Sequence, residues 1–347
     1  MNLAIAITPG DPAGVGPEIV AKAFRDAPDA LRGCFVLGLP RMMQQASNQI
    51  GGATMRRISS PTEAWAAAPG EMPVLSLSDS DLLSKQEQIS HISSGQINDL
   101  AGQFSACCVR EATLMALRAE IAAVVTAPIH KEAWAAAGVR FPGHTEMLQS
   151  LAAQHANTTP AHMPVRMMLA NDELRTVLVS IHVSLRQAIE QVNQAQVLQT
   201  IQITHQALAQ TLGRAPRIAV AGLNPHAGEG GLMGREEIDE IAPAIGAARA
   251  QGIDAHGPFA PDTVFMKARG LQSFDVVVAM YHDQGLIPVK YLGVDKGVNV
   301  TLGLHNGQGR ALIRTSPDHG TAFDIAGQGK ADASSLIEAV RQAKALA

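Results

Sequence analysis

The sequence predicts an α/β fold built on a mostly parallel sheet. Short apolar runs alternate along the chain with longer segments of helical periodicity. The runs lack a strict alternation of apolar and polar residues, as expected of strands that helices cover on both faces. With 347 residues, 46% of them hydrophobic, the chain can bury a large core. We expect two lobes, the second formed by the middle third of the chain from about Lys131 to Asp283.

Two long helices and seven strands are expected. The segment Asn98–Glu120 has apolar residues at helical spacing, and Ser184 forms a capping box with Gln187 that opens a helix over Gln187–Leu212. The expected strands begin, in chain order, at Leu3 (LAIAIT), Cys34 (CFVLG), Ala122 (AAVVTA), Arg166 (RMMLA), Thr176 (TVLVSIH), Arg217 (RIAVAG) and Asp275 (DVVVAMYH).

Composition and charge exclude several classes of function. The net charge of -4 provides no basic face for nucleic acid or an anionic membrane, and 3% aromatic residues are too few for a protein that stacks single-stranded bases. No apolar stretch reaches the roughly 18 residues of a membrane span. Three cysteines without a Cys-x-x-Cys pair form neither a disulfide framework nor a zinc ribbon. We expect a soluble, cytoplasmic protein.

Unusual polar residues follow the C-terminal ends of the expected strands. Thr8–Glu18 follows the first strand and Thr126–Lys131 a later one, while His182, Asn224–His226 and His282–Asp283 end three more. Ligands bind at this edge of open α/β sheets. The positions therefore indicate a binding or catalytic site.

Three of these residues, His182, His226 and His282, are candidate metal ligands. Their separations are too long for a zinc finger, so they can meet only through the fold, and three nitrogen ligands would leave positions open for a substrate. Three separate histidines that cap strands or bond to the backbone explain the residues equally well. Asp262 and Asp283 are candidates for contacts to the ligands or for a further oxygen ligand.

Two loops precede expected helices. TPGDPAGVGPE leads into a helix near Pro17, and its glycines allow a close approach of the backbone to an anion, although the loop matches neither the GxGxxG fingerprint nor the P-loop. A rigid turn explains it equally well. In FPGHTE, His144 and Thr145 either bind a phosphate or cap the helix that starts there.

The C-terminal third carries cations and a glycine-rich loop. Lys290, Asn299 and Arg314 could neutralise a substrate with phosphate and carboxylate ends, although each alone is more often a solvated or structural residue. In DHGTAFDIAGQGKAD, His319 beside a base and Asp324 on ribose hydroxyls would suit an adenosine.

Eight segments together resemble the 4-hydroxythreonine-4-phosphate dehydrogenase family of vitamin B6 biosynthesis. The HGTAFDIAG loop is also similar to the nucleotide loop of isocitrate and isopropylmalate dehydrogenases. The segments run in order along nearly the whole chain: TPGDPAGVGPE, TAPIHKEAW, FPGHTE, GLNPHAGEGGLMGREE, GPFAPDTVF, MYHDQGLIPVKY, GVNVTLGL and IRTSPDHGTAFDIAG.

The resemblance implies a fold of two α/β/α lobes around a cleft, like that of isocitrate and isopropylmalate dehydrogenases and unlike a Rossmann fold. Residues 1–130 and 285–347 would form the nucleotide-binding lobe. Residues 131–284 would form the metal-binding and dimerisation lobe.

The resemblance also implies an activity. The family oxidises the C3 hydroxyl of 4-phosphooxy-L-threonine with NAD or NADP, and the β-keto acid then loses CO2. A homodimer would hold a divalent metal (Zn, Mg or Co) across its interface. Lys290 and Asp262 are the first candidates for proton transfer, and Asp283 is a third. The implied site residues are the metal ligands His182, His226 and His282, the substrate contacts His144, Thr145, Lys290, Asn299 and Arg314, and the nucleotide contacts His319, Gly320, Thr321 and Asp324.

One segment departs from the family pattern. HNGQGRA follows TLGL and lengthens the interval between Asn299 and Arg314 by several residues. We expect this glycine-rich turn to extend away from the core. It leaves open a paralogue that oxidises phosphoerythronate, D-threonate phosphate or a dihydrodiol acid. A catalytically silent phosphate- or metal-binding protein is a further alternative, against which the intact histidines and Asp324 argue.

Overall fold

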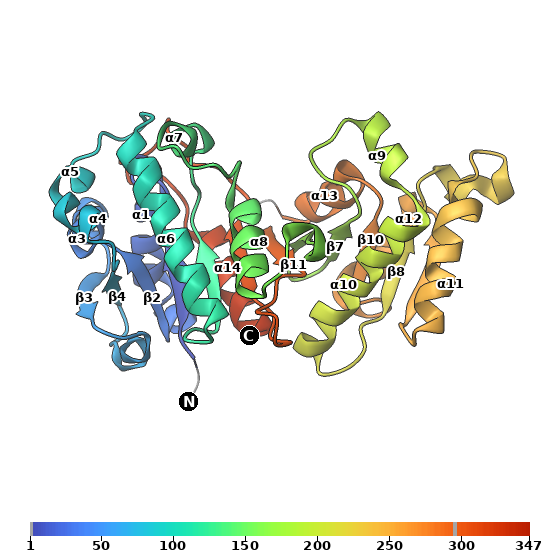
Figure 1. Ribbon diagram of the computed structural model, residues 1–347, viewed down its shortest axis with the longest axis horizontal. Coiled ribbons are helices and arrows are strands. Elements are labelled where there is room, and N and C mark those ends of the chain that lie inside the picture. The colour runs from blue at the N-terminus through green and yellow to red at the C-terminus, as the bar shows by residue number, and fades with distance from the viewer. Residues whose placement is uncertain (1–2, 294–296) are drawn as a thin grey trace. The chain divides into compact units, whose positions relative to one another are not determined.

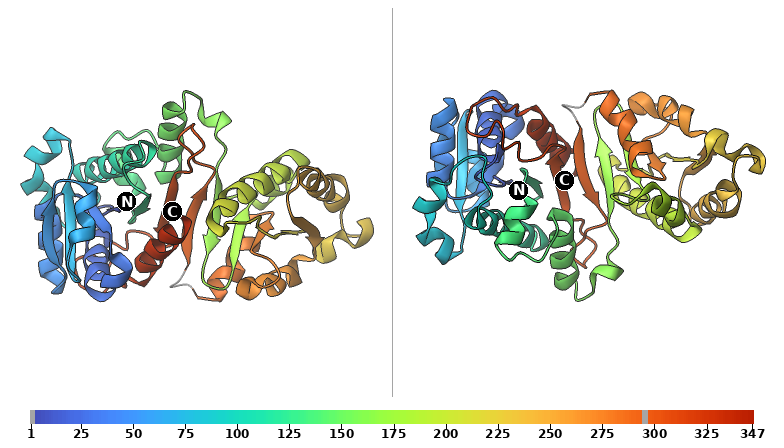
Figure 2. Two further views of the ribbon diagram at one scale, coloured as in Figure 1. Left: turned by 90° about the horizontal axis from the view of Figure 1, so that it is seen from below. Right: turned by 90° about the horizontal axis from the view of Figure 1, so that it is seen from above.

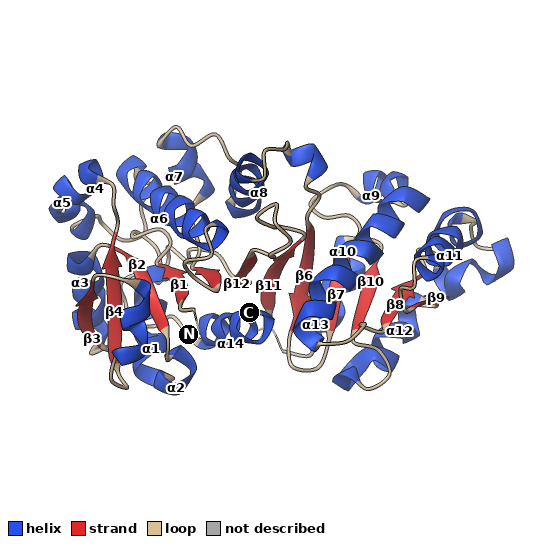
Figure 3. Cartoon of the chain, turned by 60° about the horizontal axis from the view of Figure 1, so that its bottom comes forward, coloured by secondary structure: helices blue, strands red, loops and turns tan. Residues whose placement is uncertain are grey.

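Two compact units make up the computed structural model, which describes residues 3–293 and 297–347 (Figure 1). The first unit takes the chain up to Met163 together with Leu304–Ala345, and the second takes Pro164–Gly303. In both units helices lie on the two faces of a sheet (Figure 3). The predicted α/β fold class is confirmed.

A parallel sheet forms the core of the first unit, in the order β3-β4-β2-β1-β5-β12. Helix α6 covers one face and α14 the other (Figure 2). The strands are β1 (Ile5–Thr8), β2 (Cys34–Gly38), β3 (Thr54–Ile58), β4 (Glu71–Ser76), β5 (Ala123–Thr126) and β12 (Ile313–Pro317). The helices are α1 (Gly16–Asp26), α2 (Pro28–Leu31), α3 (Pro40–Ile50), α4 (Ser80–Ser84), α5 (Gln86–Ser90), α6 (Asp99–Leu117), α7 (Lys131–Ala136), α8 (His144–His155) and α14 (Ser334–Leu346), with short 3-10 turns η1 (Pro61–Ala66) and η2 (Pro160–His162).

The second unit has a mixed sheet in the order β11-β6-β7-β10-β8-β9. Helix α10 lies on one face, and α12 and α13 lie on the other (Figure 2). The strands are β6 (Arg166–Ala170), β7 (Arg175–Leu178), β8 (Ile218–Ala221), β9 (Ala255–Phe259), β10 (Val276–Ala279) and β11 (Val298–Leu302). The helices are α9 (Leu185–Gln191), α10 (Gln194–Leu212), α11 (Ala242–Ala250), α12 (Pro261–Ala268) and α13 (His282–Tyr291), with shorter turns η3 (Pro225–Gly231), η4 (Glu237–Ile241) and η5 (Arg269–Leu271).

The units divide the chain after Met163 and after Gly303, whereas the sequence suggests divisions near residues 130 and 285. Two contacts account for the observed positions. Helix α8 packs on α6, which keeps the segment after residue 130 with the first unit. Strand β11 pairs with β6, which keeps the segment after residue 285 with the second.

All seven expected strands are confirmed, and the pairing is mostly parallel, as predicted, with one exception. Strand β6 runs antiparallel to both of its neighbours. A tight turn joins it to β7, in which Asn171 Oδ1 accepts hydrogen bonds from the backbone N–H groups of Glu173 (2.9 Å) and Leu174 (2.8 Å). A connection this short can join only antiparallel strands, because parallel strands need a crossover.

The long helices agree with those expected from the sequence, with one correction. Helix α6 occupies the segment expected to be helical, and the capping box of Ser184 and Gln187 is confirmed. The expected helix over Gln187–Leu212 is instead two helices, α9 and α10. Asn193 separates them, and its side chain caps α10 by accepting a hydrogen bond from Gln196 N–H (3.0 Å). Within the described part of the chain, no helix has both the length and the apolar character that crossing a membrane requires.

A buried carboxylate fixes the start of β10, the strand that leads to His282. Asp275 accepts hydrogen bonds from both Arg214 amines (2.7 and 2.8 Å) and from the backbone N–H of Arg217 (2.8 Å). Burial acts to raise the pKa of Asp275, but the hydrogen bonds from the two arginines lower it well below its ordinary value. The carboxylate therefore stays ionised although its side chain is only 3% exposed.

We expect Asp275→Asn to lower the free energy of unfolding by about 2 kcal/mol at pH 7, because charged hydrogen bonds are lost at a buried site. Since the folded-state pKa is depressed, this contribution is present above the unfolded pKa of about 4 and is lost as the pH falls through the folded pKa. Urea denaturation at pH 7 and at lower pH measures both effects. Asp239→Asn, which breaks an exposed pair with Arg235, is the control and should change stability by about 0.5 kcal/mol or less. Equal effects of the two substitutions would contradict the argument.

Candidate functional site

The first unit brings a buried arginine to the C-terminal ends of its central strands. Arg314 lies on β12 opposite Val124 of β5 and is only 4% exposed. Its Nε and Nη2 atoms donate hydrogen bonds to Thr126 Oγ1 at the end of β5 (3.0 and 2.7 Å). Burial lowers the pKa of Arg314 to about 10, although the negative charge of Glu146 acts in the opposite direction. The guanidinium therefore remains charged at neutral pH at the edge where ligands bind.

His144 opens helix α8 beside this arginine. The residue is half-buried, and its Nε2 atom is buried with no hydrogen-bond partner among the described residues. The edge of the Trp134 ring packs against it, with ring centroids 5.6 Å apart. Burial, followed by the positive charges of Arg314 and Lys131, lowers the pKa of His144 well below its ordinary value. The imidazole is therefore neutral at pH 7. Thr145 follows in the first turn of the same helix.

Two glycine-rich loops that are far apart in the sequence pack together in the first unit. The backbone N–H of Val15 donates to the carbonyl of Thr321 (3.0 Å). A Cβ atom on Gly14 would lie 2.9 Å from the same carbonyl, so this close approach requires glycine. His130, which precedes α7, stacks on Phe323 with ring centroids 4.6 Å apart. The loop after β1 and the loop after β12 therefore form one surface.

Sequence reasoning did not single out three polar side chains at this surface, Thr8, Asp11 and His130. Asp11 is fully buried, and burial raises its pKa despite the hydrogen bond from Ala13 N–H and the nearby charge of His130. Asp11 Oδ2, His130 Nδ1 and Thr8 Oγ1 are buried without a hydrogen-bond partner among the described residues. The motifs TPGD and PIHK at two strand ends are the signal that could have singled them out.

The loop over residues 318–332 is more open. His319 is exposed and donates its Nδ1–H to the carbonyl of Gly320 (2.9 Å). Asp324 is also exposed, and its backbone carbonyl accepts a hydrogen bond from the Gln328 side chain (2.7 Å). The Asp324 carboxylate forms no hydrogen bond within the described residues. The structure thus brings His319, Gly320, Thr321 and Asp324 together beside the loop that follows β1.

The second unit carries the candidate metal ligands. The rings of His182 and His282 lie close, with centroids 5.6 Å apart, and His282 donates its Nδ1–H to Asp283 Oδ1 (2.7 Å). Both histidines lie beyond the strand ends, since β7 ends at Leu178 and β10 at Ala279. Among the described residues of this single chain, no three His, Cys, Asp or Glu side chains form a group that could hold a metal ion. His226 is therefore not brought into one cluster with the other two.

The donor set of His182 and His282 nevertheless fits a divalent metal. Two imidazoles on one ion, with metal–nitrogen distances of about 2.0–2.1 Å, have ring centroids roughly 5 Å apart, close to the spacing observed. The hydrogen bond to Asp283 fixes the proton of His282 on Nδ1, which leaves the lone pair on Nε2 as the one that could bind a metal. A carboxylate behind a histidine is the usual outer contact of such sites.

The loop around His226 is held in an uncommon conformation. His226, Ala227 and Glu229 all have positive φ (52°, 52° and 42°), and His182 does as well (37°). Glu237 anchors the loop by accepting hydrogen bonds from Leu223 N–H and Asn224 N–H (2.7 Å each). Burial acts to raise the pKa of Glu237, but the hydrogen bonds from Asn224, its own N–H and Leu223 lower it overall.

The other predicted residues of the second unit come from three elements. Asp262 is exposed in the first turn of α12, a helix that packs against the segment carrying His226. Lys290 lies half-buried in the last turn of α13, and Asn299 lies on β11 opposite Leu169. His144, Thr145 and Arg314 belong to the first unit, so the predicted substrate contacts are distributed over both.

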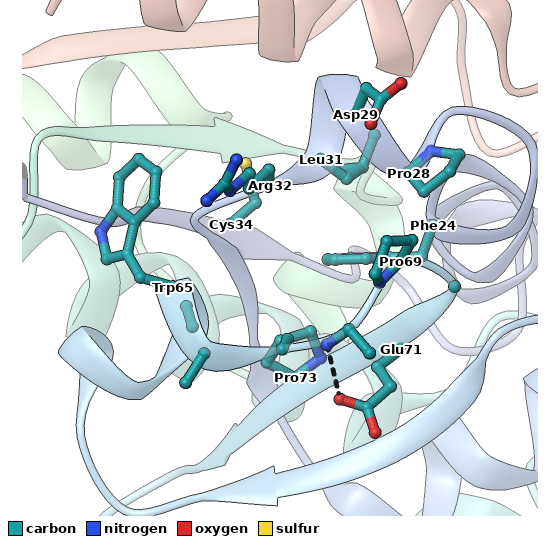
Figure 4. A pocket seen from close by; sticks show the side chains of 15 residues that line it. Phe24, Pro28, Asp29, Leu31, Arg32, Cys34, Trp65, Pro69, Glu71 and Pro73 are labelled. Atoms are coloured by element: carbon teal, nitrogen blue, oxygen red, sulfur yellow. Dashed lines mark hydrogen bonds between the residues drawn. The ribbon is translucent and has the colours of Figure 1, made fainter.

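A pocket in the first unit lies away from these residues, at the N-terminal ends of β2 and β4 (Figure 4). Phe24, Trp65 and Pro73 contribute to its walls. The Glu71 carboxylate there accepts a hydrogen bond from Ala68 N–H (2.8 Å). Because β1, β2, β4 and β5 are parallel, their N-terminal ends lie on one side of the sheet and their C-terminal ends on the other. The pocket is on the N-terminal side, whereas the Arg314 guanidinium and the loop after β1 are on the C-terminal side. The pocket is therefore separate from the predicted site.

The inserted turn over residues 305–311 also lies at the edge opposite the site. An antiparallel bridge closes it, and Arg310 donates to the carbonyl of Ile121 (3.3 Å), just before β5 begins. A Cβ on Gly307 would lie 2.8 Å from Ala156, which follows the last residue of α8. His144 opens the same helix, about 18 Å away along its axis at 1.5 Å per residue. The structure agrees with a turn that extends away from the site.

Comparisons with known proteins point to one family. The sequence profile described as "Pyridoxal phosphate biosynthetic protein PdxA" matches residues 30–343. The chain is 52% identical over 335 residues to the 4-hydroxythreonine-4-phosphate dehydrogenase of Beijerinckia indica, covering 96% of this chain and 91% of that protein. It is 41% identical to the D-threonate 4-phosphate dehydrogenase of Pectobacterium atrosepticum, with both chains fully covered. The crystal structure of 4-hydroxythreonine-4-phosphate dehydrogenase from Klebsiella pneumoniae is similar, with a TM-score of 0.84, 40% identity and 99% of each chain covered.

We expect Arg314→Met to raise the pKa of His144. Of the two positive charges that disfavour the imidazolium, the charge of Arg314 has the larger effect on this pKa, and the substitution removes it. The pKa should stay below about 6.5, because burial, the main cause of the depression, remains. NMR titration of the ring C–H signals, with His144→Gln for assignment, measures the shift. Lys131→Met is the matched control and should raise the pKa less. An unchanged pKa in Arg314→Met would show that the charge does not act on His144.

Proposed function

The chain belongs to the family of the pyridoxal phosphate biosynthetic protein PdxA and is a dehydrogenase of that family; from this premise we propose that it oxidises the C3 hydroxyl of 4-phosphooxy-L-threonine with NAD(P). The product, 2-amino-3-oxo-4-phosphooxybutanoate, would lose CO2 to give 3-amino-2-oxopropyl phosphate. The observation that carries the choice of substrate is the 52% identity to a 4-hydroxythreonine-4-phosphate dehydrogenase.

Arg314 and helix α8 support binding of an anionic group of the substrate. The buried guanidinium supplies a charge that stays in place at neutral pH, and neutral His144 and Thr145 add hydrogen-bonding atoms at a helix N-terminus. Lys290 and Asn299 would contact the remaining polar groups. Such contacts fix the substrate so that C3 can face the nicotinamide ring.

His182, His226 and His282 would hold a divalent metal, Zn, Mg or Co, in a homodimer. When bound, such a metal would polarise the C3 hydroxyl for oxidation and would stabilise the negative charge that develops on the C3 oxygen as CO2 leaves. Asp283 would keep His282 in the tautomer that presents Nε2. The hydroxyl proton must leave as hydride passes from C3 to the nicotinamide, and Lys290, Asp262 and Asp283 are the proposed groups for this transfer.

Exposed apolar side chains support the homodimer. Leu185, Leu232 and Ile287 follow the three histidines by a few residues and are 59%, 85% and 63% exposed, and Tyr291 is 90% exposed. Large apolar side chains that stay exposed on a single chain are typical of interaction surfaces. A second copy of the chain would cover them and supply the metal site across the interface.

The loop with His319, Gly320, Thr321 and Asp324 would hold the adenosine half of the cofactor. The Asp324 carboxylate, which has no partner within the described residues, is suited to accept hydrogen bonds from ribose hydroxyls. The same negative charge would repel a 2′-phosphate. We therefore infer a preference for NAD over NADP.

A second candidate substrate is D-threonate 4-phosphate. A relative with that substrate in its name is 41% identical over the full length of both chains. The two substrates share a phosphate and a hydroxyl next to it, but D-threonate carries a hydroxyl in place of the amine. The metal, the anion contacts and the hydride acceptor would serve both reactions.

A panel of phosphorylated hydroxy acids tests the proposal. NADH or NADPH formation is followed by absorbance with 4-phosphooxy-L-threonine, D-threonate 4-phosphate and 4-phosphoerythronate. We expect the highest kcat/KM with 4-phosphooxy-L-threonine and NAD, and loss of activity on exhaustive chelation that divalent metal restores. A higher kcat/KM with D-threonate 4-phosphate would transfer the assignment to the second candidate. Full activity after chelation would exclude the metal role.

Shortening the inserted turn over residues 305–311 to a single residue should leave kcat/KM within about tenfold, or roughly 1.4 kcal/mol in the barrier. The reason is that the turn lies before the start of β5, whereas the Arg314 guanidinium reaches Thr126 at the end of that strand and His144 opens the far end of α8. Arg314→Ala should cost far more, because it removes a charge-assisted contact to a substrate anion. The same absorbance assay compares the two variants. If the shortened protein lost activity as fully as Arg314→Ala, the turn would have to act on the site.

A further inference from the structure

A fully buried tryptophan packs beside His144 in the first unit. Trp134 lies on α7 and is 0% exposed, whereas the other tryptophan of the chain, Trp65, is 37% exposed. The Trp134 and His144 rings meet edge to face, with their planes inclined by 62° and their centroids 5.6 Å apart. Trp134 therefore covers one side of a predicted substrate contact.

The indole N–H anchors Trp134 on helix α6. It donates a hydrogen bond to Ser105 Oγ (2.9 Å), and the Ser105 hydroxyl in turn donates to the carbonyl of Gly102 (3.1 Å). Ser105 is also fully buried. Because its single hydroxyl proton is already used, its lone pairs are left to accept the indole N–H. A buried N–H group without an acceptor is unfavourable, so this hydrogen bond selects one orientation of the Trp134 ring.

Glycine at position 102 allows α7 to lie close enough for this bond. A Cβ atom on Gly102 would clash with the carbonyl oxygen of Ala133 and would lie 3.0 Å from Trp134 N. The backbone of Trp134 is fixed as well, since its N–H donates to the carbonyl of His130 (3.1 Å). The two helices therefore hold the tryptophan ring in place without any contribution from His144.

The orientation of the His144 ring depends on packing. Its Nε2 atom is buried and has no hydrogen-bond partner among the described residues, so no hydrogen bond through this atom holds the ring. The torsion that turns an imidazole about its bond to Cβ has a broad minimum, which leaves the choice of angle to the surrounding atoms. The rigid indole is one of the walls that make this choice.

Trp134 also excludes water from one side of the imidazole. Burial is the largest cause of the low pKa of His144, ahead of the positive charges of Arg314 on β12 and Lys131 on α7. Glu146, in the first turn of α8, carries a negative charge that acts on Arg314. The indole carries no charge, so it affects His144 through burial alone.

We propose that Trp134, held by Ser105, is a positioning residue for the substrate: it keeps the His144 ring in the orientation that contacts the substrate anion and shields that ring from water. The inference rests on the proposed function, since it takes His144 as a substrate contact. A ring that is already oriented loses less conformational entropy when the anion binds, so the effect belongs to binding and not to hydride transfer. A tryptophan that only fills the core would contribute to stability and would leave His144 unaffected.

Trp134→Leu tests the contact directly. The pKa of His144, followed by NMR with His144→Gln for assignment, should rise, because part of the burial is lost. In the absorbance assay the KM for the phosphorylated substrate should rise about tenfold, whereas kcat and the KM for NAD should stay within about twofold. Phe104→Leu is the matched control. It shrinks another fully buried aromatic ring of the first unit, which lies near Gly38 of β2, and should lower stability without changing the pKa or the KM.

Ser105→Ala provides the test if Trp134→Leu does not fold. It leaves the indole in the protein but removes the acceptor of its N–H, so the ring can turn away from His144. The KM for the substrate should rise several-fold, again without a matching change in kcat. Thr113→Val is the control, because it removes another buried hydroxyl of α6, which donates to the carbonyl of Val109 in the same helix (2.7 Å). Its KM should stay as in the wild type.

Any of three results would overturn the proposal while leaving the dehydrogenase assignment intact. These are an unchanged pKa of His144 in Trp134→Leu, a rise in KM for the substrate no larger than in Phe104→Leu, and an unchanged KM in Ser105→Ala, with or without a fall in kcat. A wild-type protein that oxidises no phosphorylated hydroxy acid would overturn this inference and the proposed function together.

Discussion

The parallel pairing of β12 with β5 is the interaction on which the first unit depends. It inserts a strand from the last tenth of the chain into a sheet whose other strands come from the first 130 residues. The register puts Arg314 opposite Val124, so that its guanidinium reaches Thr126 at the strand end. The chain that leaves β12 is thereby carried to the loop after β1, where Thr321 meets Val15. Without this pairing neither the buried cation nor the joined glycine-rich loops would exist.

Local pattern was sufficient to predict seven of the twelve strands in the described part of the chain. Continuous apolar runs predicted all seven strands, and the capping box at Ser184 was visible because capping depends on residues three apart. Five strands, β3, β4, β9, β11 and β12, were missed because they are short and contain polar residues, proline or glycine, as in AHGPF. The break at Asn193 was missed because asparagine both caps helices and occurs inside them, and only tertiary contacts decide between the two.

The candidate site was predictable to the level of residue type and strand end. His182 and His282 do lie together, yet the sequence could not show that Asp11 Oδ2 and His130 Nδ1 would be buried without a hydrogen-bond partner among the described residues, because burial depends on which loops pack over them. Strain is equally invisible in sequence. The left-handed backbone at His182 and His226 costs on the order of 1–3 kcal/mol at each position, and it persists where surrounding contacts fix the loop. Glu237 provides these contacts for the loop that carries His226, because it accepts hydrogen bonds from two backbone N–H groups just before that residue. This role explains why a carboxylate is buried there.

The choice of arginine at position 314 follows from its burial. The same environment that lowers its pKa to about 10 would act on a lysine, whose ordinary value of about 10.4 starts lower than that of arginine. A buried lysine would therefore approach neutrality near physiological pH, and the charge would depend on the pH. Arginine starts high enough to stay ionised, and its planar group donates two hydrogen bonds to Thr126. A constant charge at this position also adds to the effect of burial, which is the main reason that the pKa of His144 is low.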